Sequence, residues 1–480
     1  MNSSISRLFG VVLLLFALLI AWTSRWTVID AAGLQHDPLN KLSLYASWQV
    51  KEGRILADNQ QVLARSVPAG GGIWKRTYPT GSLFGDAVGF ENIELGQNAG
   101  IEQFRLPALT ATQQTTLGAV FGPISSSSVG DDVYTTLDPT AQKLARTLLD
   151  GRVGNVVAIV PQTGAVPVMY SNPNYNSNDP FSCHGIGCQV PSVVDGLYPP
   201  GSTFKVVTTT AAMNSGKYNP LSIIVGNSPL EVSGYPLHND SNQSWGPVTL
   251  TTALINSINT VYAQVGQDVG AATMQNYMHR FGFYSEPPLD YPDTEMYASG
   301  ERDLQTGNLL EPTNPPCTNT YNCVDLGRMS IGQDKLLVTP LQMAMVVSAV
   351  ADDGTLMRPH LTSKIVNPDG QVVEAIASSV YSHVMSRAVA KELQSMMTQV
   401  VEEGTGQSAN LDGLDAAGKT GTAQIGNSDI DDAWFIGFAP ASAPRIAVAV
   451  ELTHIANGYG GVYAAPIAAQ LMKLLLSEDL

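Results

Sequence analysis

The sequence predicts an α+β domain, in which helices flank an antiparallel sheet, behind an apolar N-terminal segment. Apolar strand patterns lie early, within residues 155–171, and late, within residues 419–453, and helical patterns lie between them. A chain of 480 residues has room for two or three domains. Its 44% hydrophobic and 14% charged residues are typical of a folded protein.

The net charge of −16 argues against nucleic acid as a partner and against a polybasic attachment to acidic lipid. An anionic substrate would therefore need a local cluster of positive charge.

Residues 1–25 are predicted to form a short cytoplasmic stub and a membrane anchor. A charge-free apolar run, residues 8–24, lies between Arg7 and Arg25. At about 1.5 Å per residue, its length is close to the minimum for a helix that crosses a bilayer. A cleaved signal peptide is the alternative, but no convincing cleavage site follows the run. A retained anchor with its amino terminus inside would place the rest of the chain outside the cytoplasm.

Residues 26–130 are predicted to form a small, mostly extended pedestal domain. Residues 53–64 are expected to form two short strands around a polar turn, and residues 69–100 are rich in glycine without a helical period. A serine run at residues 125–128, followed by Asp131 and Asp132, marks the expected boundary to a domain of residues 131–480.

The four cysteines form two close pairs, Cys183 with Cys188 and Cys317 with Cys323. Neither pair has the two-residue spacing of a zinc ribbon or a redox loop, and no histidine cluster accompanies them. Two short-loop disulfides in an oxidising compartment are therefore favoured over free thiols. Cross-pairing between the two loops is the alternative.

Within residues 131–480 several helix starts and strands are predicted. Asp138 and Pro139 are typical of a helix cap and first turn, and Gly151 is expected to end that helix. Two apolar strands, residues 155–161 and 165–171, should form a hairpin. Further helices are expected from residue 339, over residues 386–402 and from residue 466, with strands over residues 419–424, 434–439 and 446–453.

The segment Pro199-Pro200-Gly201 should end the preceding chain and start a helix whose first turn carries Ser202, with Lys205 one turn later. A spacing of three puts both side chains on one face, within reach of each other. A serine nucleophile needs such a base, and a helix start offers amide donors to a developing anion. Alone, Ser-x-x-Lys is a weak signal, because about one copy is expected by chance in a chain this long.

A second polar cluster is Ser257 and Asn259, which bracket one apolar residue between two helical runs. The hydroxyl could relay protons and the amide could bind a peptide group. A simple turn between helices is the alternative, since Ser and Asn are favoured in turns.

A third cluster, Lys419-Thr420-Gly421-Thr422, opens a predicted strand. A lysine and hydroxyls along a strand edge can bind a carboxylate by charge-assisted hydrogen bonds. Gly421 would let a ligand backbone lie against the strand. Taken alone, a Lys-Thr-Gly is more often a solvated strand start.

In this order the three clusters resemble the motif set of penicillin-binding proteins and serine β-lactamases. Residues 198–205 are similar to the nucleophile segment of the penicillin-binding protein family. Residues 330–333 with 338–344 are similar to its following helix, and residues 418–423 with 433–440 to its sheet core. The resemblance covers residues 131–480 strongly and residues 26–130 loosely. It implies a class B enzyme of the penicillin-binding protein A type, because the chain has no room for the glycosyltransferase domain of class A.

The resemblance implies a D,D-transpeptidase that cross-links peptidoglycan stem peptides and is inhibited by β-lactams. Ser202 would attack the carbonyl between two terminal D-alanines, with Lys205 as the base and Ser257 as the proton shuttle. Lys419, close to Lys205, would lower the pKa of that lysine.

The same resemblance implies how the substrate is bound. Asn259 would hold the peptide groups of the donor, and Thr420 and Thr422 its carboxylate, while the backbone amides of Ser202 and Thr422 would form the oxyanion hole. No metal or organic cofactor is implied. The expected partners are stem peptides, β-lactams, the cytoplasmic membrane and proteins of cell division or elongation.

Two other classes share the motifs. A class A serine β-lactamase needs a dedicated Glu for deacylation, and Glu231, the only Glu between Ser202 and Ser257, lacks the motif context. A β-lactam sensor needs a larger signalling part than the seven residues before the apolar run. A scaffold that kept only the fold should have lost at least one cluster.

Overall fold

The computed structural model describes residues 3–25, 48–111, 129–183, 188, 190–312, 323–411, 413–425 and 430–478. The serine run of the expected domain boundary lies outside these residues, and so does Cys317.

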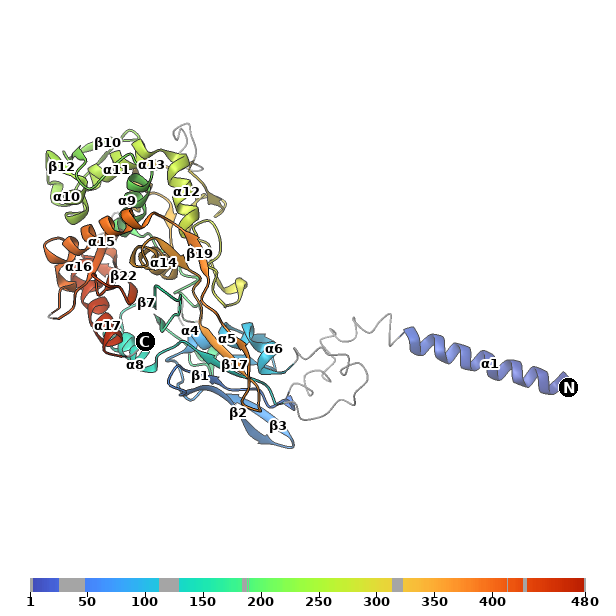
Figure 1. Ribbon diagram of the computed structural model, residues 1–480. Coiled ribbons are helices and arrows are strands. Elements are labelled where there is room, and N and C mark those ends of the chain that lie inside the picture. Colours follow the sequence, from blue (N-terminus) through green and yellow to red (C-terminus); the bar gives the residue numbers. More distant parts are fainter. Residues whose placement is uncertain are drawn as a thin grey trace.

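The apolar N-terminal run forms one helix, α1 (Ser3–Ser24), as predicted. Residues 5–24 have a mean hydropathy of 2.4, and the helix is long and apolar enough to cross a membrane. None of that apolar surface is buried by the protein itself (Figure 1). This exposed apolar surface is unfavourable in water and would be favourable among lipid chains.

The core of the C-terminal part is a five-stranded antiparallel sheet. Its strand order is β20 (Ala417–Gln424), β21 (Ile430–Ala439), β22 (Ile446–Ala456), β7 (Gly154–Ile159) and β8 (Val168–Asn172). This confirms the three late strands and the early hairpin. Strand β8 begins three residues later than predicted, because Ala165 pairs instead with His360.

Helices pack on the sheet as the α+β class requires (Figure 1). α8 (Pro139–Leu149) and α17 (Ala465–Ser477) contact each other and the sheet, and α14 (Pro340–Ala351), buried along its whole length, packs against β7 and β22. α15 (Arg387–Glu402) packs on β20. The predicted caps are present, since Asp138 accepts hydrogen bonds from the backbone amides of Thr140 and Ala141.

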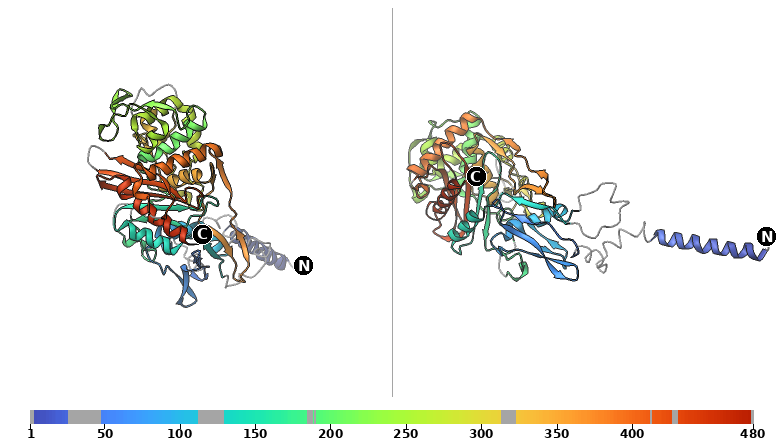
Figure 2. Two further views of the ribbon diagram at one scale, coloured as in Figure 1. Left: turned by 60° about the vertical axis from the view of Figure 1, so that its left-hand side comes forward. Right: turned by 60° about the horizontal axis from the view of Figure 1, so that its bottom comes forward.

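A helical lobe adjoins the β20 end of the sheet. Its helices are α9 (Lys205–Asn214), α10 (Leu250–Ile255), α11 (Asn259–Val269), α12 (Ala271–Phe281) and α13 (Leu326–Met329). The lobe also contains two pairs of short strands: β9 (Ile223–Val225) with β12 (Pro247–Thr249), and β10 (Leu230–Val232) with β11 (Tyr235–Leu237). The lobe and the N-terminal sheet lie at opposite ends of the globular part (Figures 1 and 2).

The N-terminal sheet has six strands, in the order β18 (Val372–Ala375), β17 (Thr362–Val366), β6 (Asp132–Thr135), β1 (Ile55–Leu56), β2 (Val62–Gly70) and β3 (Ile73–Thr77). The two short strands predicted within residues 53–64 are confirmed. Three of the six strands come from beyond residue 131, so this sheet is built from both sides of the expected boundary. That boundary stays a prediction.

Short helices accompany this sheet, in a region that was expected to be mostly extended. They are α4 (Gly85–Val88), α5 (Gly100–Phe104) and α6 (Leu106–Leu109), and each is four or five residues long. The remaining elements are β4 (Glu91–Asn92), β5 (Gln97–Asn98), β13 (Gly300–Arg302), β14 (Leu309–Leu310), β15 (Leu336–Leu337), β16 (Thr355–Met357), β19 (Val380–His383) and α16 (Gly460–Tyr463).

A buried ionic cluster holds this N-terminal region together. Arg76 contacts Glu102 at 2.7 Å and Glu52 at 3.4 Å, and all three side chains are buried. Burial raises the pKa of Glu52 to about 8, although Arg76 opposes the shift. Removing the guanidinium would leave two carboxyl groups in an apolar environment without a counter-charge.

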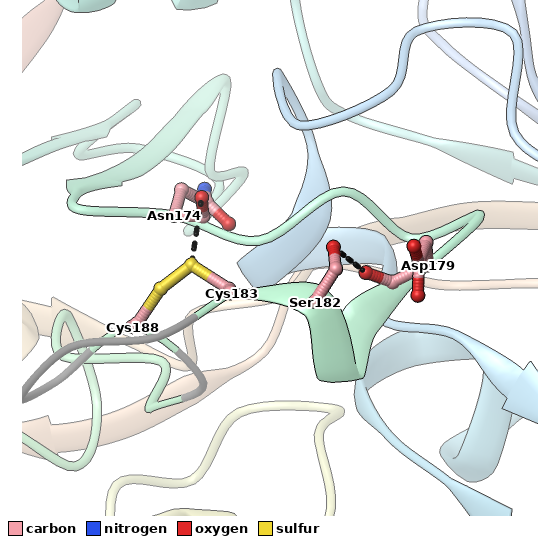
Figure 3. Close-up of a disulfide and its surroundings, with 5 residues drawn as sticks. All are labelled: Asn174, Asp179, Ser182, Cys183 and Cys188. Atoms are coloured by element: carbon pink, nitrogen blue, oxygen red, sulfur yellow. Dashed lines mark hydrogen bonds between the residues drawn. A yellow bond between two sulfur atoms is a disulfide. The ribbon is translucent and has the colours of Figure 1, made fainter.

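The predicted disulfide between Cys183 and Cys188 is present (Figure 3). The two Cα atoms are 6.0 Å apart, within the usual range for a disulfide. Cys323 is also disulfide-bonded.

Candidate active site

The nucleophile turn, residues 198–204, precedes α9. The prediction placed Ser202 in the first turn of a helix, but Gly201–Phe204 forms a 3-10 turn, and α9 begins at Lys205. Gly201 has a φ of 52°, and a Cβ there would lie 2.7 Å from the carbonyl oxygen of Thr422. The turn is therefore pressed against β20 and requires glycine at this position.

Three contacts hold the nucleophile turn in place. Trp434 Nε1 donates a hydrogen bond of 3.0 Å to the Pro199 carbonyl, and its ring packs edge-on against Tyr198. The amide of Gly201 donates to the carbonyl of Gly332 at 3.0 Å. Ser202 itself stays half-buried, so its hydroxyl lies at the border between the core and solvent.

Lys205 lies fully buried beside the second cluster. Its Nζ donates to the Ser257 carbonyl at 2.7 Å and to Asn259 Oδ1 at 2.6 Å, and it lies 3.1 Å from Ser257 Oγ. Ser257 has a φ of 56° and lies in the middle of the link between α10 and α11. A turn between the two helices is therefore present, and Ser257 within it and Asn259 at the start of α11 both direct polar side chains to the lysine.

Lys419 reaches the same hydroxyl from β20. Its Nζ is 3.0 Å from Ser257 Oγ and donates to the Thr420 carbonyl at 2.9 Å. Ser257 Oγ thus lies between the amino groups of two buried lysines, which come from positions 214 residues apart in the chain.

The electrostatics follow from this burial. Burial lowers the pKa of Lys419 to about 7. Burial also lowers the pKa of Lys205 well below its ordinary value, and the charge of Lys419 lowers it further. Both shifts favour a neutral amine that can accept a proton, next to a hydroxyl that can pass one on.

The threonines of the third cluster have partners that the sequence did not indicate. Thr420 Oγ1 and Thr405 Oγ1 are 2.6 Å apart, and the amide of Gly460 points to Thr422 Oγ1 at 3.4 Å. Thr405 lies in a turn between two glycines, and Gly460 begins α16 beside Gly461; these glycines were the only local signal for them.

Gly421 has a different neighbour from the one expected. A Cβ there would lie 2.8 Å from the Pro200 carbonyl and 2.9 Å from Thr203 Cγ2. The glycine therefore makes room for the nucleophile turn of the protein itself. The expected contact between Gly421 and a ligand backbone stays a prediction.

Comparisons with known proteins agree with this geometry. Residues 154–473 match the family described as penicillin-binding protein transpeptidase domain, and residues 52–124 match the penicillin-binding protein A dimerisation domain. The peptidoglycan D,D-transpeptidase PbpA of Mycolicibacterium smegmatis is 30% identical over 511 residues, with both chains fully covered. The protein of the same name from Mycobacterium tuberculosis is 29% identical over 515 residues, again with full coverage.

Solved structures are similar as well. Penicillin-binding protein A from Mycobacterium tuberculosis, as a ceftriaxone acyl-enzyme complex, superposes with a TM-score of 0.76 at 27% identity and covers 90% of this chain and 99% of that one. The D,D-transpeptidase domain of a peptidoglycan glycosyltransferase from Eggerthella lenta gives a TM-score of 0.75 at 29% identity, covering 89% and 99%.

Proposed function

Since the chain belongs to the penicillin-binding protein transpeptidase family and is a serine D,D-transpeptidase of peptidoglycan, we propose that Ser202 is its nucleophile. The observation that supports this most strongly is the buried relay of Lys205, Ser257 Oγ and Lys419, in which Lys205 lies three residues after Ser202. A serine hydroxyl needs a neighbouring base, and a neutral lysine is one.

The proposed reaction has two acyl-transfer steps. Ser202 Oγ attacks the carbonyl between the two terminal D-alanines of a donor stem peptide, and Lys205 takes the hydroxyl proton. The peptide C–N bond breaks, and Ser257 Oγ passes a proton to the nitrogen of the departing D-alanine. An amine of a neighbouring stem peptide then attacks the ester, and its proton returns through the same relay while Ser202 is released.

Substrate binding is assigned to the residues around this relay. Asn259 binds the donor peptide groups, and Thr420 and Thr422 bind the terminal carboxylate near the positive charge of Lys419. The backbone amides of Ser202 and Thr422 stabilise the developing oxyanion, a contribution typically worth about 3–4 kcal/mol per donor. The close approach of Gly201 to the Thr422 carbonyl supports this pairing.

We further propose that β-lactams acylate Ser202, since the Mycobacterium tuberculosis protein of similar fold forms a ceftriaxone acyl-enzyme. The test uses the full chain in detergent micelles with a fluorescent penicillin. We expect one label per protein molecule, lost in Ser202→Ala and kept in Ser395→Ala, an exposed serine on α15. Labelling of Ser202→Ala at the wild-type level would refute the assignment, and release of the adduct within minutes would favour a β-lactamase.

The transfer itself is tested with a donor stem pentapeptide and an amine acceptor. We expect D-alanine release with formation of the cross-linked product, and neither product from Ser202→Ala. Release of D-alanine without any cross-link at a saturating acceptor concentration would indicate a carboxypeptidase.

The chain is also proposed to be a single-pass membrane protein with its catalytic part outside the cytoplasm. The apolar helix α1 and the disulfide Cys183–Cys188 support this side. Added protease should cleave the globular part in spheroplasts and spare it in inverted vesicles, and the reverse pattern would contradict the proposal. Proteins of cell division or elongation are expected partners, to be sought by cross-linking in intact cells.

A further inference from the structure

A row of residues crosses the central sheet beneath the nucleophile turn. Cross-strand pairing joins Gly421 to Trp434, Trp434 to Glu451, Glu451 to Asn155, and Asn155 to Ser171. Directly opposed residues point to the same face of a sheet. That face carries the nucleophile turn, because Gly421 faces Pro200 and Trp434 donates to Pro199.

Glu451, at the centre of this row, is completely buried and has no part in the relay. Asn155 Nδ2 donates to its Oε2 at 2.7 Å, and Thr453 Oγ1 donates to its Oε1 at 2.8 Å. The titratable groups that face it are Asp432 on β21 and Tyr198 in the nucleophile turn. Among the groups that act on Glu451 in the described part of the chain, none is cationic.

Glu451 is therefore a carboxylic acid at neutral pH. Burial raises its pKa to about 8, and the charge of Asp432 adds to the effect. Burial likewise raises the pKa of Asp432 to about 6, although its Oδ1 accepts a hydrogen bond from the amide of His454. In its neutral form Glu451 keeps its hydrogen bonds with Asn155 and Thr453, and no unpaired charge is buried in the core.

The network continues to the nucleophile turn through Tyr198. Burial raises the pKa of Tyr198 to about 12, and three neighbours of its phenol hydroxyl oppose the shift: Asn155 and Thr453, which hold Glu451, and Ser192. The ring packs on Trp434, and the backbone of Tyr198 exchanges two hydrogen bonds with Val338. The ring and the backbone of Tyr198 are thus both held in place, four residues before Ser202.

We propose that Glu451 is a positioning residue for Ser202, acting through Asn155, Thr453 and Tyr198. The proposal rests on the assignment of Ser202 as the nucleophile. Loss of the side chain would leave the Asn155 amide without an acceptor and let the phenol of Tyr198 shift. Ionisation of Glu451 would also shift the residues around Tyr198, because a buried carboxylate next to Asp432 draws its hydrogen-bond donors toward itself.

The test compares acylation rates of the full chain in detergent micelles with a fluorescent penicillin, between pH 6 and pH 9.5. Glu451→Gln keeps the shape and cannot ionise, so its rate should be within about twofold of wild type at pH 6.5. Above pH 9 we expect it to exceed the wild-type rate at least fivefold, since most wild-type molecules then carry the charge. Glu451→Ala should acylate at least tenfold more slowly at pH 6.5, and Tyr198→Phe should also be slower.

A ratio of the Glu451→Gln rate to the wild-type rate that stays constant with pH would overturn the proposal. So would wild-type acylation by both Glu451→Ala and Tyr198→Phe. If Glu451→Ala does not fold, the pH profile of Glu451→Gln and the rate of Tyr198→Phe decide. Persistent labelling of Ser202→Ala, by contrast, would remove the proposed nucleophile, so the two failures are distinguishable.

Discussion

Replacing Lys419 with methionine is expected to stabilise the protein while it abolishes acylation. Lys419 is fully buried, and burial lowers its pKa from 10.5 to about 7. The unfolded chain therefore binds a proton between pH 7 and pH 10.5 that the folded chain releases. A buried lysine with a lowered pKa costs stability, and active sites commonly carry such a cost.

The magnitude follows from proton linkage. Each tenfold change in an equilibrium constant corresponds to about 1.4 kcal/mol, so the full pKa difference is worth about 5 kcal/mol. Methionine also loses the hydrogen bonds to Ser257 Oγ and to the Thr420 carbonyl, at about 1 kcal/mol each. The net gain in unfolding free energy should be about 3 kcal/mol below pH 7. Above pH 10.5 the linkage contribution vanishes, and the variant should become slightly less stable than wild type.

The assay is urea unfolding of the full chain in detergent micelles at pH 6.5, 8 and 10, followed by tryptophan fluorescence. Lys143→Met, on the exposed face of α8, is the matched control and should stay within about 0.5 kcal/mol of wild type at each pH. Lower stability of Lys419→Met than of wild type at pH 6.5, or a stability difference that does not change with pH, would refute this expectation.

Three further substitutions test the packing around the site. Gly421→Ala places a methyl group against the Pro200 carbonyl, so we expect a loss of about 1–3 kcal/mol and slower acylation; unchanged stability and rate would contradict the contact. Trp434→Phe leaves the Pro199 carbonyl without its donor and should cost about 1–3 kcal/mol in urea unfolding, with slower labelling but unchanged stoichiometry. Arg76→Leu leaves two buried glutamates without their positively charged partner and should lower the free energy of unfolding by about 3–5 kcal/mol. Each folded molecule should still be labelled at the wild-type rate.

Local signals in the sequence predicted most of the secondary structure of the C-terminal part. The caps at Asp138, Thr339 and Ser386 each accept a backbone hydrogen bond at the start of a helix. Such signals work because a cap or a strand alternation depends on neighbours within a few residues. The N-terminal sheet was harder to predict, since β6 and β17 join it from distant parts of the chain. No local pattern encodes that pairing.

The sequence by itself determined the chemical groups and their order along the chain: a serine with a lysine three residues on, a serine and an asparagine in a turn, and a lysine opening a strand. Only the tertiary structure decided that Ser257 Oγ lies between the two lysines, that Gly421 faces the nucleophile turn, and that Glu451 lies beneath it. The reason is physical. Burial and charge proximity, which set the pKa values of these groups, arise from sheet register and helix packing between segments far apart in the chain.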